Sequence, residues 1–319
     1  MLFSTDIKKA VTLLQQGKLV AFSTETVYGL GADARNPNAL LKIFQAKQRP
    51  VDHPLIVHIA DIAQLSEWAS EVPESAKLLA KAFWPGPLTL ILNKATGVSD
   101  LVTGNQSTVG IRIPGHPVAL ALLKAFGGGV AAPSANRFGR ISPTTAEAVY
   151  EELGETVDLI LEGGACEVGL ESTIVDLTGE LPTILRPGMI TVNEIEAVLN
   201  QSVSTHKKEA PRVSGSLESH YAPQTKTELI HPQDIPLFLQ QLASQDLPIA
   251  LLTRTEIKIS IAQVHCVTMP LHAKEYAHDL YHLLRKLDKE HFQQILVETV
   301  PEEAEWDAVR DRLKRASSK

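Results

Sequence analysis

A polar segment near residue 200 constrains the fold more than any other feature of this sequence. The stretch NQSVSTHKKEAPRVSGSLESHYAPQTKT is rich in Pro, Gly and Ser and shows no periodic apolar pattern. Such a composition is typical of a linker with an extended or irregular backbone. We therefore expect two domains, residues 1–200 and 225–319, joined by a linker over residues 201–224.

The apolar patterns on either side of this linker predict an α/β fold. Strand-like runs before it outnumber helical ones without strict alternation, which favours a twisted mixed sheet over a doubly wound one. After it, strands alternate with helices, as in a small βαβ domain. Helices are expected at residues 4–18, 38–48, 63–70, 75–84, 117–126, 145–154, 276–290 and 305–317, and strands at 19–24, 54–59, 88–93, 108–113, 129–134, 158–163, 172–177, 183–188, 228–232, 248–253, 263–270 and 293–299.

The composition favours a folded protein that acts on small molecules. Hydrophobic residues make up 44% of the chain, which supports a core, and the formal net charge is -7. An acidic chain lacks the basic field of a dedicated nucleic-acid binder, so any RNA contact needs a local patch. Cys166 and Cys266 lack ligand-like spacing, which predicts thiols in a reducing cytoplasm. No apolar run approaches the roughly 18 residues of a membrane span, so we expect a cytoplasmic protein without membrane contact.

Cations and imidazoles gather ahead of the second expected strand. The stretch FQAKQRPVDHPLIVHI contains Lys47, Arg49, His53 and His58. Arginine offers a planar fork to phosphate or carboxylate oxygens, and lysine adds a mobile charge beside it. Taken alone, the pattern also fits a solvated helix C-terminus and structural histidines.

Similar polar turns elsewhere favour a binding site. The segments STETVYGLGAD, STVGIRIPGHP and AAPSANRFGRISPTT place hydroxyls and backbone donors after short strands. Arg112 alternates with isoleucines, so it faces a polar cavity or solvent. Ser134 and Asn136 share one face of an extended chain, which suits ligand recognition. A serine hydrolase, a P-loop and a dinucleotide fingerprint are disfavoured, because their glycine motifs are absent.

Two last segments, ESTIVD and TILRPG, add Ser172 and Arg186. Arg186 precedes Pro187, which holds its backbone in an extended conformation. Arg186, Arg49, Arg112 and Lys47 would together offset about four negative charges, which matches a nucleoside triphosphate better than a monoanion. Spacing alone leaves open whether these side chains converge.

These motifs carry a resemblance to a known family. STETVYGLGADA, AKQRPVDHPLIVHI, FWPGPLTLIL, STVGIRIPGHP, APSANRFGRISPTTAEAV, ESTIVDL and ILRPG are similar, in this order, to the YrdC-like domain. With the SHYAP linker and a small terminal domain, nearly the whole chain resembles the two-domain Sua5 family of threonylcarbamoyl-AMP synthases. The resemblance implies a twisted α/β sheet with a concave, positively lined cavity, followed by a small Rossmann-like domain.

The activity that the resemblance implies is the condensation of L-threonine, bicarbonate or CO2, and ATP into threonylcarbamoyl-AMP, with release of pyrophosphate. Mg²⁺ would accompany ATP, and no metal ligand from the protein is assigned. The product would feed a tRNA threonylcarbamoyl-transferase complex, which modifies adenosine 37 of tRNAs that read ANN codons.

The resemblance also assigns roles to residues. The family's K-x-R and S-x-N signatures match Lys47, Arg49, Ser134 and Asn136, the expected catalytic set. Lys47 would serve phosphate or the bicarbonate-derived carboxylate. The residues expected to bind ATP are Arg49, His53, Thr108, Asn136, Thr144, Arg186 and the linker's Tyr221, and those expected to bind L-threonine are Thr26, His58, Arg112, Ser134 and Ser172.

Two departures and two rival interpretations accompany this assignment. His53 stands where many relatives carry Asn, and the linker GSLESHYAP lacks the basic, Met-containing form of some relatives. A double-stranded RNA-binding module without turnover is the main alternative, and weak tRNA contact stays open. A carbamoyl-transfer domain of the hydrogenase-maturation type is disfavoured, because its acylphosphatase and zinc-finger segments are absent.

Overall fold

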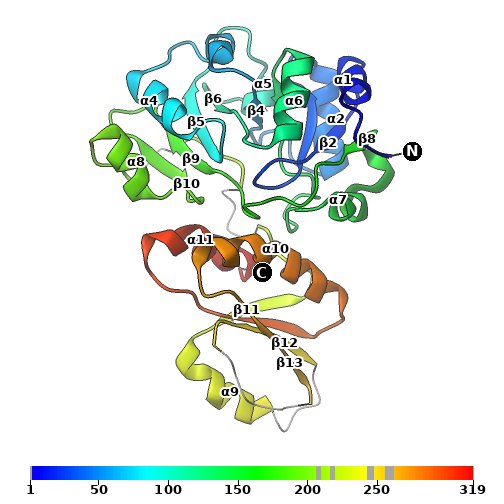
Figure 1. Ribbon diagram of the computed structural model, residues 1–319, viewed down its shortest axis with the longest axis vertical. Helices are drawn as coiled ribbons and strands as arrows, with labels where there is room; N and C mark the ends of the chain where they lie inside the picture. The colour runs from blue at the N-terminus through cyan, green and yellow to red at the C-terminus, as the bar shows by residue number, and fades with distance from the viewer. Residues whose placement is uncertain (1, 206–209, 216–219, 243–247, 256–261, 319) are drawn as a thin grey trace. The chain divides into compact units, whose positions relative to one another are not determined.

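The protein contains two compact units, which Figure 1 shows in a computed structural model. The structure describes residues 2–205, 210–215, 220–242, 248–255 and 262–318. The first unit comprises residues 1–138 and 142–216, and the second comprises residues 139–141 and 217–319. The described residues of the expected linker lie outside the helices and strands, and its residues 206–209 and 216–219 fall outside the described part of the chain.

A ten-stranded mixed sheet, in the order β1-β8-β2-β3-β7-β4-β6-β5-β9-β10, organises the first unit. β8 pairs in parallel with both β1 and β2, whereas β3 pairs antiparallel with both β2 and β7. The strand bounds are β1 (Phe3–Ser4), β2 (Val20–Phe22), β3 (Gly29–Asp33), β4 (Ile56–His58), β5 (Leu88–Asn93), β6 (Thr108–Arg112), β7 (Val130–Ala131), β8 (Leu159–Leu161), β9 (Thr173–Asp176) and β10 (Thr183–Arg186).

Helices cover both faces of this sheet (Figure 1). β2 shows the alternation that permits this: Val20 and Phe22 join one apolar cluster, with residues from α1 and α6, while Ala21 joins the other. The larger cluster takes in residues of α2, α3, α4, α7 and α8. The helix bounds are α1 (Ile7–Gln15), α2 (Pro37–Lys47), α3 (Leu65–Trp68), α4 (Glu74–Phe83), α5 (Asp100–Thr103), α6 (Pro117–Phe126), α7 (Ala146–Leu153) and α8 (Val192–Leu199).

One buried strand, β3, lies where the sequence predicts only a turn-rich segment. Its sequence GLGAD lacks the β-branched and aromatic residues that usually signal a strand. The glycines are required by packing, because a Cβ on Gly31 would lie 2.8 Å from the Phe22 ring and 2.9 Å from Val130. In this strand, Leu30 and Ala32 bury their side chains in the core, while the glycines allow close contact on the other face.

The second unit is a small Rossmann-like domain. Its four strands all pair in parallel, in the order β11-β14-β12-β13. Tyr276, Tyr281 and Leu284 are among the buried residues of its longest helix, α10. Its elements are β11 (Lys226–Ile230), α9 (Ile235–Leu242), β12 (Ile249–Thr253), β13 (Val264–Thr268), α10 (Ala273–Lys289), β14 (Gln294–Glu298) and α11 (Asp307–Ala316).

The expected fold class is confirmed: a mixed-sheet α/β domain is followed by a small Rossmann-like domain. Besides β3, the sequence patterns missed β1, α5, α8 and α9, which are short elements. Among the helices that the structure describes, none combines the length and apolar character that a membrane crossing requires.

Candidate functional site

Two neighbouring strands bring an imidazole and a guanidinium together. β4 and β6 are parallel, and their register makes His58 and Arg112 direct partners at the carboxyl ends of the strands. Both residues are buried, with 4% of each exposed. Parallel strands present functional side chains at this end of the sheet, so the pair is suited to ligand binding. The possibility that Arg112 faces solvent is therefore wrong.

Arg112 contacts groups from the turn after β2 and from the turn before β5. Its Nη1 donates to the Thr26 hydroxyl at 3.0 Å, and its Nε donates to the Gly86 carbonyl at 3.2 Å. Its Nη2 lies 2.7 Å from Glu25 Oε1 in a buried ion pair. The guanidinium is thus fixed in place by a hydroxyl, a carbonyl and a carboxylate.

His58 is a neutral imidazole in this environment. Burial, with a further contribution from the nearby charge of Arg112, lowers the pKa of His58 to about 3. The ring also packs edge-on against Phe22, with centroids 6.2 Å apart. At neutral pH, His58 can therefore both donate and accept a hydrogen bond.

Lys47 of the K-x-R motif contacts the backbone of the S-x-N motif. It is the last residue of α2, only 1% is exposed, and its Nζ donates to the carbonyls of Ser134 and Asn136 at 2.5 Å each. Burial and the neighbouring charge of Arg49 lower the pKa of Lys47. The interpretation of Lys47 as a solvated helix end is wrong, because its ammonium clamps the loop after β7.

Arg49 is also buried, with 6% exposed, and lies just beyond the end of the same helix. Gln48, at φ 52°, ends α2 in the left-handed conformation, which turns the chain. The Arg49 guanidinium donates to the Pro54 carbonyl at 2.9 Å and lies 5.5 Å from the centre of the Phe138 ring. The His53 ring packs edge-on against Phe138 at 5.0 Å. An aromatic ring thus links two of the expected ATP ligands.

A second arginine group lies where β9 begins and β10 ends. Arg186 Nη2 donates to the Ser172 hydroxyl at 3.0 Å, and Arg186 Nε donates to the Ser172 carbonyl at 3.1 Å. The Ser172 hydroxyl shares a 2.8 Å hydrogen bond with Thr89. The structure therefore places Ser172, expected at threonine, against Arg186, expected at ATP.

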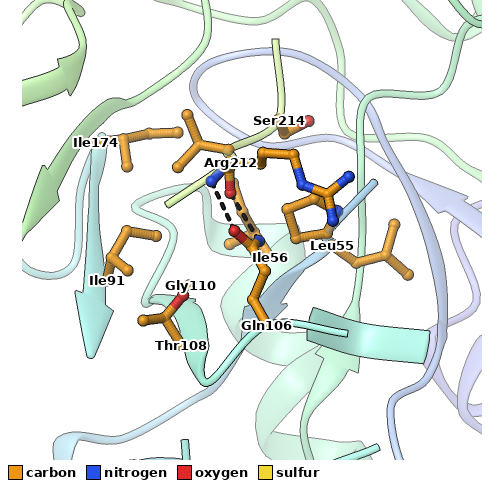
Figure 2. A pocket seen from close by; sticks show the side chains of 11 residues that line it. Leu55, Ile56, Ile91, Gln106, Thr108, Gly110, Ile174, Arg212 and Ser214 are labelled. Atoms are coloured by element: carbon orange, nitrogen blue, oxygen red, sulfur yellow. Dashed lines mark hydrogen bonds between the residues drawn. The ribbon is translucent and has the colours of Figure 1, made fainter. Parts of the chain in front are cut away.

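A pocket opens beside this group, and Figure 2 shows its lining. Thr108 lines it together with Arg212 and Ser214, two residues of the expected linker. The Ser214 carbonyl accepts a 2.9 Å hydrogen bond from Arg186 Nη1. Gln106 exchanges two hydrogen bonds with the Arg212 backbone, at 2.7 and 3.0 Å. Within the first unit, part of the linker thus lies against two expected ATP residues.

For the two remaining expected ATP residues, Thr144 and Tyr221, the structure gives contacts to other groups. Thr144 is buried and its carbonyl accepts from the Cys166 backbone at 3.0 Å, without a described contact to the other candidates. Tyr221 belongs to the second unit, where its ring stacks on Tyr281 at 5.8 Å and lies 5.2 Å from the Arg312 guanidinium.

Sequence reasoning missed Glu25, Thr89 and Phe138. Thr89 and Phe138 carried no separate signal, because one lies inside an apolar strand and the other next to the S-x-N motif. Glu25 is an acidic residue between two threonines at the end of a strand, which could have marked it. Within the described part of the chain, no group of three or more His, Cys, Asp and Glu side chains could hold a metal ion.

Comparison with known proteins agrees with this architecture. The sequence profile of the Sua5–YciO–YrdC family, described as "Telomere recombination", matches residues 12–188. The profile described as "Threonylcarbamoyl-AMP synthase, C-terminal domain" matches residues 190–318. The chain therefore belongs to the Sua5–YciO–YrdC family.

Relatives match along nearly the full length. A threonylcarbamoyl-AMP synthase of Pyrococcus abyssi is 38% identical, over 98% of this chain and 94% of that protein. One of Bacillus subtilis is 40% identical, over 98% and 92%. The crystal structure of P. abyssi Sua5 complexed with L-threonine superposes with a TM-score of 0.89, at 38% identity, covering 98% of this chain and 94% of that one.

Proposed function

We propose that the protein synthesises threonylcarbamoyl-AMP from L-threonine, bicarbonate or CO2, and ATP, and releases pyrophosphate. The observation that carries this proposal is the buried Arg112 group, in which a guanidinium, a hydroxyl and a neutral imidazole meet at the ends of two strands. A relative that is 38% identical along nearly the whole chain is described as complexed with L-threonine, which supports the same conclusion.

In this proposal, Arg112 binds the threonine carboxylate, because a guanidinium fork matches two carboxylate oxygens. Thr26 and His58 lie beside it and supply a hydroxyl and an imidazole for the remaining polar groups of threonine. Ser134 and Ser172 complete the threonine set. A pocket built to hydrogen-bond the substrate hydroxyl rejects analogues that lack it.

In this proposal, Arg49 and Arg186 bind the ATP phosphates. Arg49 and Arg186 are buried cations, and Thr108 lines the pocket together with Ser214, whose carbonyl accepts from Arg186. His53, Asn136, Thr144 and Tyr221 complete the proposed ATP set. Lys47 contributes by holding the Ser134–Asn136 loop, and a direct contact with phosphate or carboxylate remains part of the proposal.

The chemistry then takes two steps. The threonine nitrogen forms a bond to the carbon of CO2, or of bicarbonate with loss of water, and protons leave the nitrogen. A carbamate oxygen next attacks the α-phosphorus, and the bond to pyrophosphate breaks. The site contributes by holding the reactants together and by offsetting the charge that develops on the phosphate oxygens.

Mg²⁺ fits this scheme as a companion of ATP. In this proposal its ligands would be phosphate oxygens and water, and no protein ligand is assigned. When bound there, it would neutralise phosphate charge. A cytoplasmic location and a downstream tRNA threonylcarbamoyl-transferase complex complete the proposal, because the product is a reactive adenylate that another enzyme must consume.

Incubation of the purified protein with all reactants, each omitted in turn, tests the activity. Mass spectrometry should detect threonylcarbamoyl-AMP and pyrophosphate only in the complete mixture. AMP formation that does not depend on threonine would instead indicate a nucleotide hydrolase. The RNA-binding alternative is not favoured, since the full-length relatives are named as synthases.

A further inference from the structure

Glu25 is a buried carboxylate for which the proposed chemistry above has no role. It follows β2 in the turn that also carries Thr26, and 7% of it is exposed. Its side chain forms an ion pair with Arg112, in which Oε1 lies 2.7 Å from Nη2. Neither oxygen of this carboxylate receives a hydrogen bond from the residues that the structure describes. A buried carboxylate without hydrogen bonds is costly, so a ligand that supplies donors would be favoured there.

The backbone around Glu25 is held firmly. The Thr24 hydroxyl accepts from the backbone N–H groups of Thr26 and Val27, at 3.2 Å each, and donates to the Val27 carbonyl at 2.6 Å. The Glu25 carbonyl accepts from the Val168 N–H at 2.8 Å. Because the turn is fixed on both sides, the carboxylate is presented to Arg112 by the fold rather than by a mobile loop.

We propose that Glu25 binds the α-amino group of threonine and accepts a proton from it. This inference rests on the proposed function, in which Arg112 binds the threonine carboxylate. A zwitterionic amino acid brings a carboxylate and an ammonium next to each other, and the buried pair of Arg112 and Glu25 presents the complementary charges. When threonine binds, its carboxylate replaces Glu25 as the ion-pair partner of Arg112. Glu25 then forms an ion pair with the threonine ammonium instead.

The proton balance follows from the reaction. An ammonium has no lone pair, so one proton must leave the nitrogen before it can attack, and Glu25 Oε receives this proton. The freed pair forms the N–C bond to CO2, and one C=O bonding pair moves onto oxygen. The second proton leaves the nitrogen as the carbamate forms, so two protons pass in total from threonine to Glu25 and from there to water. Glu25 is thus a catalytic residue of the first step.

The neighbours of Glu25 leave it as the natural acceptor. Among the described residues, the Arg112 guanidinium from β6 and the Cys166 thiol lie near it, with His58 of β4 next to Arg112. Burial raises the pKa of Cys166 to about 12, and that of His58 is lowered to about 3, so both are neutral near pH 7. Neither group can be a strong acceptor for the ammonium proton under those conditions.

Binding of two ligands distinguishes amine recognition from mere support of Arg112. L-threonine and (R)-3-hydroxybutyrate share the carboxylate and hydroxyl, but the second lacks the amine. In Glu25→Gln, we expect threonine to bind about 10- to 100-fold more weakly, as for a lost charged hydrogen bond. (R)-3-hydroxybutyrate should bind equally well or better, because its carboxylate no longer competes with Glu25 for Arg112.

The opposite pattern would overturn the proposal. If Glu25 only positions Arg112, the substitution weakens both ligands equally, and if Glu25 has no role, neither affinity changes. Glu74→Gln makes the same chemical change at an exposed side chain on α4, so it should leave both affinities unchanged. Glu25→Asp keeps the carboxylate and should retain the preference for threonine over (R)-3-hydroxybutyrate. It replaces Glu25→Gln as the test variant if that protein does not fold.

Turnover tests the proton-accepting role. At pH 7, Glu25→Gln should form threonylcarbamoyl-AMP at least 100-fold more slowly at saturating threonine, in line with the loss of a general base. The deficit should shrink as the pH rises toward 9.5, because solution then supplies the neutral amine. A deficit that is constant with pH would contradict the base role. Absence of product with the wild-type protein would refute the proposed function, whereas the binding comparison would still test Glu25.

Discussion

At the residue scale, buried cations are the main property of the candidate site. Lys47, Arg49, Arg112 and Arg186 each have at most 6% of their surface exposed. Burying such charges costs free energy unless hydrogen bonds or opposite charges compensate. In this protein main-chain carbonyls supply part of this compensation, because each of the four cations donates to at least one of them.

Substitution of Lys47 should reveal its structural role. Lys47→Met removes the donor that the Ser134 and Asn136 carbonyls share, one part-buried and the other buried. We expect the free energy of unfolding to fall by about 2–4 kcal/mol, as for lost hydrogen bonds to a charged group. Denaturant titration measures this. Unchanged stability with lost activity would show instead that Lys47 acts on the ligand alone.

His58 should make stability depend on pH. Its pKa of about 3 lies below the value of about 6.5 in an unfolded chain, so only the unfolded state takes up its proton between these values. Stability is therefore lost as the pH falls below 6.5, by about 2 kcal/mol at pH 5. Denaturant unfolding of the wild type and of His58→Asn, at neutral pH and at pH 5, measures how much stability each protein loses. Equal pH dependence in the two proteins would rule out this contribution.

At the element scale, β3 shows what a sequence pattern cannot express. Its glycines look like turn residues, yet they permit the approach of β2 and β7. The long helices and apolar strands were predictable because each carries its own periodic signal. The convergence of Ser172 with Arg186, or of Glu25 with Arg112, depends on contacts between distant segments and could not be read from spacing.

Gly31 should be much less tolerant of substitution than Gly29 on the same face of β3. A Cβ at Gly31 would lie 2.8 Å from the Phe22 ring, whereas one at Gly29 would lie 3.3 Å from the Cβ of Ala132. We expect Gly31→Ala to destabilise by about 1–3 kcal/mol, in the range of overpacked cores, and Gly29→Ala by less. Melting temperatures of the two variants give the comparison, and equal melting temperatures would be inconsistent with the packing argument.

The linker should respond to ligands. Its residues Arg212 and Ser214 contact Asp52 and Arg186, so the segment meets the pocket that Thr108 lines. We expect ATP with threonine to slow proteolysis within residues 201–224, as a segment that orders over the nucleotide would. Mass mapping of the fragments measures this, and cleavage that the ligands leave unchanged would contradict the expectation that this linker acts as a lid over the nucleotide.

At the scale of the whole molecule, the resemblance of the sequence motifs to the family was the strongest signal, and it is confirmed by profiles that cover residues 12–188 and 190–318. Composition and periodicity alone supported an α/β protein of two domains that acts on small molecules. The specific reaction could come only from the motifs, because charge and hydroxyl content do not distinguish one phosphate-binding enzyme from another.

Isotope tracing tests the central claim most directly, since the reaction unites three substrates in one product. Incubation with ¹³C-bicarbonate, ¹⁵N-threonine and ATP should give an adenylate that carries both labels, detected by mass spectrometry. AMP that carries neither label, formed at the same rate with or without threonine, would contradict the proposal that these residues build a threonylcarbamoyl-AMP synthase.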